Sequence, residues 1–308
     1  MKNLIWILAW LGNGLVAAQT PMTPPATAID RAFNQLYNYD FAGAHAILDA
    51  EQRIHPEDPL IYAVRSAAYL YSEFDRLKIL ESDFFADDDQ ITDRKRLTPD
   101  PAARERLFQA TAEARKRARA RLAVDPNDTN AMFALCTAAG AETDYFGLIE
   151  KKYFRAYSLS KESQQYAHKL LTMKPPFYDA YLTLGTVEYV VGSLNFFFRL
   201  FIRLNQIEGS KQKGIENLKK VIAGGRYFPP FAKTLLVAIY LREKQVEPAL
   251  VLMKELERDF PGNPLIKKEM KRALDRINRA QKDGKGTVTH LKTRYAAPFG
   301  SAVCCQTP

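Results

Sequence analysis

The 308-residue chain is poor in the residues from which catalytic and metal-binding sites are usually built. Its three cysteines are too few for a framework of disulfides, and its four histidines stand singly, with no pair at the spacing of metal ligands. No glycine-rich loop follows an expected strand, and no serine or cysteine lies in a nucleophile motif. These absences predict a protein that is not an enzyme and that uses no cofactor or metal ion.

The chain also lacks an apolar run long enough to cross a membrane. The run from Leu4 to Leu11 stops at Gly12, whereas a spanning helix needs about 20 residues. Because this run follows Lys2 and leads to small residues ending at Ala18, residues 1–18 resemble a signal peptide, with export to the periplasm or the cell exterior. An uncleaved anchor or an ordinary N-terminal helix is the alternative. Export argues against nucleic acid as the partner, although the net charge is +9.

No convincing strand is present, and helical periodicity dominates from Ile29 onward. Residues 19–27 form a Pro/Thr linker, residues 28–280 a helical domain and residues 281–308 a flexible tail. One pattern recurs in the domain: a small residue, an apolar residue four positions later, and a helix-ending proline eight positions after that. The five copies of this repeat pattern are Ala44–Leu48–Pro56, Ala114–Ala118–Pro126, Ser163–Ala167–Pro175, Gly214–Leu218–Arg226 and Ala249–Met253–Pro261, and in the fourth copy an arginine stands in the place of the proline.

The repeat pattern indicates stacked helix pairs, because small residues let two helices approach closely and an isolated pair cannot bury its apolar face. Further residues occur at matching positions: Phe41, Ile54, Tyr62, Ser66, Tyr69, Tyr181, Gly185, Val237 and Tyr240. Together they resemble the tetratricopeptide repeat family, with insertions at 73–101 and 192–210 that lengthen its 34-residue period. The resemblance implies an all-α fold, a right-handed α-solenoid of stacked antiparallel helix pairs. Residues 265–281 are expected to form a C-terminal capping helix.

Proteins of that family hold partner segments in a groove lined by the first helix of each pair. Carried onto this sequence, the groove residues are Phe33, Ala63, Ala67, Asn130, Phe133, Thr137, Asp179, Leu182, Thr186, Tyr189 and Thr234. The lysines and asparagines with which some relatives grip a terminal carboxylate are absent, so an extended or helical segment suits this groove better. The resemblance implies a non-enzymatic adaptor or scaffold in the bacterial envelope with a protein or peptide partner. Packing of these positions against inserted helices is the alternative.

The insertion at 192–210 is rich in aromatic residues. Within it a candidate ridge comprises Phe197, Arg199, Phe201, Arg203 and Leu204. Such a ridge suits a partner groove or an anionic membrane surface, with the arginines toward the headgroups. The simpler interpretation is that the aromatics pack over the helices. The alternative function is therefore a membrane-associated, lipid-binding protein that uses the segment Phe196–Ile207.

The insertion at 73–101 is acidic, and the helix expected at 102–124 is basic. The aspartates of the insertion do not match a calcium-binding loop, so we expect a solvated loop. On the basic helix, Arg115, Arg117 and Arg119 form a candidate surface for an anionic partner. A solvated face that is partly neutralised within the protein is the alternative.

Overall fold

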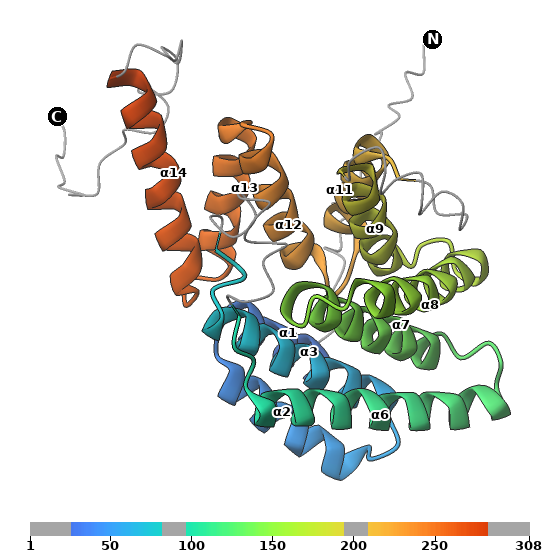
Figure 1. The fold of residues 1–308 in the computed structure, drawn as a ribbon. Coiled ribbons are helices and arrows are strands. Elements are labelled where there is room, and N and C mark those ends of the chain that lie inside the picture. Colours follow the sequence, from blue (N-terminus) through green and yellow to red (C-terminus); the bar gives the residue numbers. More distant parts are fainter. Residues whose placement is uncertain (1–25, 82–96, 194–208, 283–308) are drawn as a thin grey trace, which may run out of the picture.

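The computed structural model describes residues 26–81, 97–193 and 209–282 of the chain. In these ranges the protein is all-helical and contains no strand, as predicted (Figure 1). None of the helices that the structure describes combines the length and the apolar character needed to cross a membrane.

The helices pack in consecutive pairs, and the first helix of each later pair also contacts the second helix of the pair before it. The pairs are α1 (Ala28–Tyr37) with α2 (Phe41–Ile54), α3 (Pro59–Arg76) with α6 (Pro101–Val124), α7 (Thr129–Asp144) with α8 (Tyr153–Met173), α9 (Tyr181–Ser193) with α11 (Lys211–Gly224), and α12 (Pro229–Arg242) with α13 (Val246–Asp259). A π-helical turn, η1 (Tyr145–Ile149), follows α7, and a 3₁₀ turn, η2 (Tyr178–Ala180), precedes α9. The last helix, α14 (Pro264–Lys282), packs against α13.

The ends of the helices follow from the local sequence. Four aspartate side chains accept a hydrogen bond from a first-turn backbone N–H: Asp40, Asp58, Asp100 and Asp128, at the starts of α2, α3, α6 and α7. The prolines of the repeat pattern lie just beyond the ends of α2, α6, α8 and α13. A proline inside a helix removes a backbone hydrogen bond and clashes with the preceding turn, so these helices stop where the sequence predicts.

The small and apolar positions of the repeat pattern lie at helix contacts. In all five copies both residues are buried. The helices α9 and α11 approach closely, since a Cβ added to Gly214 would lie 2.7 Å from the Tyr189 Cβ and 2.8 Å from the Gly185 carbonyl oxygen. Only a residue without a side chain allows the two backbones to pack at this distance.

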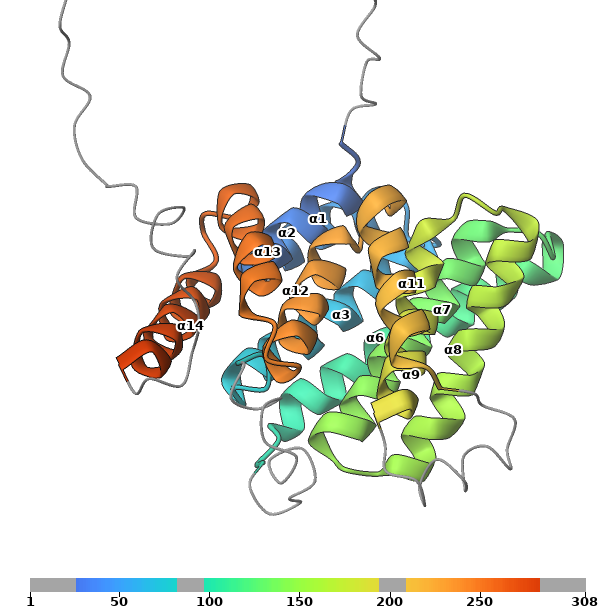
Figure 2. The same cartoon turned by 90° about the horizontal axis from the view of Figure 1, so that it is seen from above.

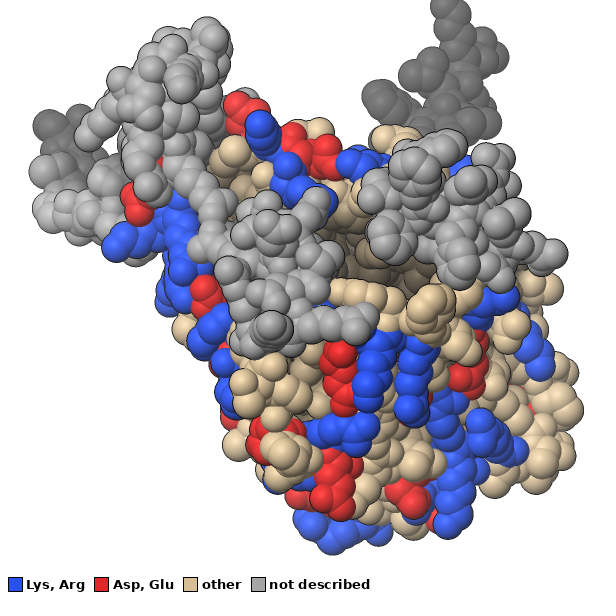
Figure 3. All heavy atoms as spheres, in the orientation of Figure 1, with Lys and Arg blue, Asp and Glu red and all other residues tan. Residues whose placement is uncertain are grey.

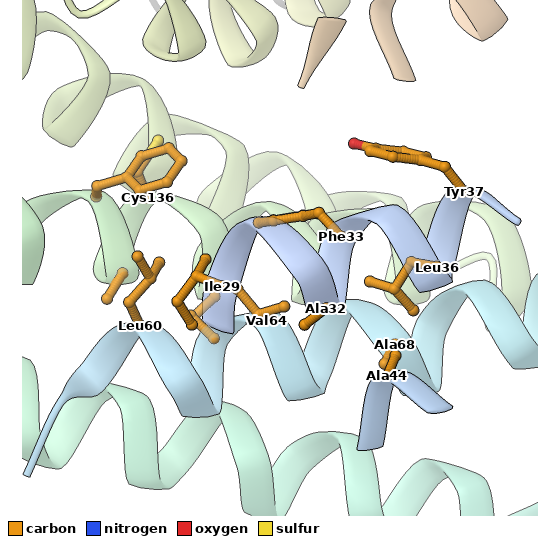
Figure 4. Packing of buried hydrophobic residues seen from close by; sticks show 14 of the residues in the cluster. Ile29, Ala32, Phe33, Leu36, Tyr37, Ala44, Leu60, Val64, Ala68 and Cys136 are labelled. Carbon is orange, nitrogen blue, oxygen red and sulfur yellow. The ribbon is translucent and has the colours of Figure 1, made fainter. Parts of the chain in front are cut away.

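The helix α1 uses two faces. Ile29, Ala32 and Leu36 point toward α3, while Phe33 and Tyr37 extend from the opposite face (Figure 4). That second face contacts the C-terminal half of the chain (Figure 2). The Phe33 ring lies 5.3 Å from the ring of Tyr227, and the Tyr37 hydroxyl donates a hydrogen bond to the Tyr227 carbonyl oxygen at 2.8 Å. The chain therefore curves until α12 returns to α1.

A single carboxylate holds the returning segment in place. Asp179 is buried, and its Oδ1 accepts hydrogen bonds from the N–H groups of Tyr227 and Phe228 at 3.0 and 2.8 Å. Its Oδ2 accepts another from the N–H of Arg226 at 2.8 Å. Asp179 thus satisfies three consecutive backbone N–H groups of the turn that leads into α12, from a distant position in the sequence.

Candidate ligand-binding hollow

The predicted groove residues fall into two groups in the structure. Six of them are buried: Phe33, Ala63, Ala67, Phe133, Asp179 and Tyr189. The other five are half-buried: Asn130, Thr137, Leu182, Thr186 and Thr234. The prediction of an open groove therefore does not hold for the first group, because the chain's own residues cover it.

The covering segment is the turn before α12. The ring of Phe133 lies 5.7 Å from the ring of Tyr227 and 5.5 Å from that of Phe228. Phe33 contacts the same two rings from α1. Tyr227 and Phe228 thus occupy the space between α1 and α7 that a partner would enter in an open helical array.

Farther along the first helices a hollow remains, which we define by α3, α7, α9 and α12. On α7, Thr137 and Asp144 lie on the same stripe as Phe133, because positions i, i+4 and i+11 share one face of a helix. On α3, the Tyr71 ring lies 5.2 Å from the Phe231 ring of α12. This contact brings the inner faces of α3 and α12 toward each other.

The helix α9 supplies the remaining side. Its Thr183 hydroxyl lies 3.5 Å from the Cys136 sulfur of α7, and its Tyr189 hydroxyl donates to Glu243 at the end of α12 at 3.2 Å. Thr186 lies between these two directions on the helix and faces the space between α7 and α12. Figure 3 shows a hollow between α12 and α9 in which the visible side chains carry no charge.

Asp144, on the α7 stripe, is an unusual acid. Its side chain makes no cap for the turn that follows it, and no hydrogen bond or ion pair to it occurs in the described part of the chain. It is half-buried, and burial alone raises its pKa from 3.8 to about 7. Burial likewise raises the pKa of Tyr71 well above 10, with a further contribution from the charge of Asp144. Asp144 is therefore a recessed acid that solvent still reaches.

A second cleft, of about 620 Å³, lies between the end of α2 and the starts of α1, α3 and α7. It includes the predicted groove residue Asn130, whose Nδ2 donates to the Asp58 carboxylate at 2.8 Å. Arg121, also in its lining, pairs with Asp128 at 2.6 Å. Asn130 and Arg121 thus already have carboxylate partners, which makes this cleft a weaker candidate for ligand binding than the hollow.

The arginines predicted as an anion surface are mostly engaged within the protein. Arg115 pairs with Glu142 at 3.0 Å and with Glu162, and its side chain is only 12% exposed. Arg117 pairs with Glu113 and lies over the Tyr62 ring at 4.1 Å. Arg119 is exposed. Acidic side chains also interrupt the basic ones over this region (Figure 3), so the predicted surface does not hold for Arg115 and Arg117.

The predicted aromatic ridge, from Phe197 to Leu204, lies outside the described residues, as does most of the acidic insertion. Asp144, Tyr71 and Phe231 are not among the residues that the sequence predicts for a site. A helical-wheel projection of α7 from Phe133 could have placed Asp144 on the inner face. It could not have shown that Asp144 has no ion-pair partner among the described residues. Comparisons with models of known protein families and with curated proteins found no match.

Proposed function

We propose that the protein is a non-catalytic adaptor that holds an extended peptide segment of a partner in the hollow between α3, α7, α9 and α12. The hollow is the observation that carries this proposal (Figure 3). The repeat pattern, which resembles that of tetratricopeptide proteins, supports a helical array whose first helices serve a partner. The signal-like residues 1–18 favour an exported protein of the bacterial envelope.

The chemistry of the lining suits a peptide. Tyr71 and Phe231 offer aromatic surface, and Thr186 offers a hydroxyl group at a half-buried position. An extended peptide presents side chains, which need apolar surface, and backbone N–H and C=O groups, which need scattered polar partners. The visible side chains of the hollow are uncharged, so a peptide that enters it covers no charge on that surface (Figure 3).

The test is selection of peptides by the purified full-length protein from a phage-displayed random library. Selected sequences are then measured as synthetic peptides by fluorescence anisotropy. The variant Thr186→Trp fills the hollow, and Thr172→Trp places the same bulk on the exposed face of α8 as a control. Circular dichroism and thermal unfolding confirm that both variants are folded.

We expect Thr186→Trp to weaken binding by about tenfold or more, equivalent to ~1.4 kcal/mol, and Thr172→Trp to leave it unchanged. Failure to select any peptide, or equal binding by the folded Thr186→Trp variant, would show that the hollow does not hold a peptide.

A further inference from the structure

The helix α8 differs from the second helices of the other pairs in the charge of its exposed residues. Each of those helices exposes at least one acid: Asp49 on α2, Glu105 on α6, Glu216 on α11, and Glu247 and Asp259 on α13. None of the exposed residues of α8 is acidic; they are Tyr153, Phe154, Arg155, Ser158, Lys161, Gln165, His168, Lys169 and Thr172. The single acid of α8, Glu162, is half-buried and pairs with Arg115 of α6. The exposed side of α8 is therefore basic.

Most of these exposed residues lie on one face of the helix, which we call the outward face of α8. Positions 154, 158, 161, 165, 168, 169 and 172 fall within a sector of about 100° around the helix axis, and the buried residues of α8 lie on the opposite side. From Phe154 to Lys169 this face extends over ~22 Å. The helix runs along the side of the molecule that lies opposite α14 (Figure 2). The outward face is thus an elongated strip and not a pocket.

The outward face also carries an apolar side chain. Phe154 is 79% exposed, and no other phenylalanine of the described residues is exposed. Single exposed apolar residues are ordinary, so Phe154 gains its meaning from its neighbours. Arg155 borders the face beside it, and Lys161 and Lys169 follow about two and four turns later. An apolar residue flanked by cations along one helix face is typical of helices that lie at a membrane surface.

The cations of this face are not neutralised by the described part of the protein. Arg155 lies over the Phe146 ring at 4.1 Å, Lys161 lies 5.9 Å from the Tyr157 ring, and Lys169 Nζ lies 3.5 Å from the Pro126 carbonyl oxygen. These contacts involve uncharged groups, and no ion pair to the three cations occurs among the described residues. Their charges therefore still attract an anionic surface.

An anionic lipid membrane matches both properties of the outward face. Its headgroups attract lysine and arginine side chains, and the boundary with the acyl chains accepts the side chain of Phe154. A membrane is also flat on this scale, as suits a straight helix whose exposed residues form one strip. An acidic protein would match the cations alone and would need a pocket of its own for Phe154.

We infer that the outward face of α8 attaches the protein to an anionic membrane surface. Phe154 enters the interface, and Arg155, Lys161 and Lys169 lie at the headgroups. This inference goes beyond the proposed function and does not depend on it, because α8 forms no side of the hollow.

The first experiment is flotation of the purified full-length protein with vesicles of phosphatidylglycerol and phosphatidylcholine, and with vesicles of phosphatidylcholine alone. The double variant Lys161→Gln/Lys169→Gln removes two charges from the outward face. Arg53→Gln/Lys267→Gln removes two exposed charges on α2 and α14 as a matched control. Circular dichroism and thermal unfolding confirm that the variants are folded.

We expect the protein to float with the anionic vesicles, and Lys161→Gln/Lys169→Gln to lower the partition coefficient by at least about tenfold. The control variant should bind nearly as the unchanged protein does, since its substitutions lie on other helices. The apolar residues within 1–18 are present in every variant, so the difference between the two double variants reports on α8.

A second experiment tests whether Phe154 enters the interface. Phe154→Trp and Ile54→Trp each place a tryptophan at an exposed apolar position, the second on α2 as a control. We expect brominated lipids in anionic vesicles to quench the fluorescence of Phe154→Trp more strongly. Trp6 and Trp10 contribute to both variants, so the difference reports on the introduced residue.

Equal flotation of the two double variants, or equal quenching of the two tryptophan variants, overturns the inference. Retention on immobilised poly-glutamate is measured beside flotation, with Phe154→Ser as a further variant. Retention that depends on Lys161 and Lys169, without flotation and without an effect of Phe154→Ser, also overturns it and indicates an acidic protein as the partner of α8.

Discussion

Replacing Asp144 by asparagine tests how burial changes the energy of this carboxyl group in the absence of any ligand. Burial raises the pKa of this carboxyl from 3.8 to about 7, and one pKa unit corresponds to ~1.4 kcal/mol. Ionised Asp144 therefore destabilises the folded protein by at most about 4 kcal/mol at pH 8. Because the Asp144 side chain is only half-buried, we expect Asp144→Asn to stabilise the protein by ~2 kcal/mol at that pH.

The pH dependence has a definite sign. The carboxyl loses its proton near pH 3.8 in the unfolded chain and near pH 7 in the folded protein. Between these values the folded protein binds more protons, so the free energy of unfolding falls as the pH rises. The stabilisation by Asp144→Asn should therefore grow from almost nothing at pH 4 to its full size at pH 8.

Thermal unfolding from pH 4 to pH 8 measures this difference. For a chain of this size 1 kcal/mol shifts the midpoint by about 2–4 °C, so we expect an increase of ~5 °C at pH 8. Asp125→Asn is the control, because it makes the same substitution at an exposed turn and preserves the oxygen that accepts from Asn127 N–H. A destabilised Asp144→Asn at pH 8 would refute the reasoning, since it would mean that the carboxylate has favourable interactions.

Three further substitutions test the packing that surrounds the hollow. Gly214→Ala should destabilise the protein by about 1–3 kcal/mol in urea unfolding, because its Cβ would lie 2.7 Å from the Tyr189 Cβ; an unchanged midpoint would contradict this. Asp179→Asn should lower stability by ~1–3 kcal/mol, because the asparagine amide nitrogen cannot accept the hydrogen bond that Asp179 Oδ2 accepts from Arg226 N–H. Arg115→Met should destabilise by about 2 kcal/mol, because it leaves two glutamates unpaired, and no loss in thermal unfolding would show that these pairs contribute nothing.

The local sequence determined the helices and their pairing. Aspartates at helix starts and prolines just beyond helix ends act within one turn of the backbone, so Asp58 and Pro56 specify their turn in any tertiary context. The small residues of the repeat pattern mark helix contacts for an equally local reason, because a small side chain allows close approach wherever the partner helix lies. The all-α fold and the buried positions of that pattern were therefore predictable.

The use of the inner face was decided by the tertiary structure. Tyr227 and Phe228 cover Phe33 and Phe133 because the chain curves back upon itself. This curvature is the sum of the small angles between successive helix pairs, so no single segment of the sequence specifies it. The same folding leaves Asp144 half-buried with no counter-charge among the residues that the structure describes. Burial and the distance to other charges, which set the pKa of a carboxyl, depend on all surrounding helices at once. The sequence gives no sign that Asp144 differs from other acids, and only the folded chain shows that burial raises its pKa.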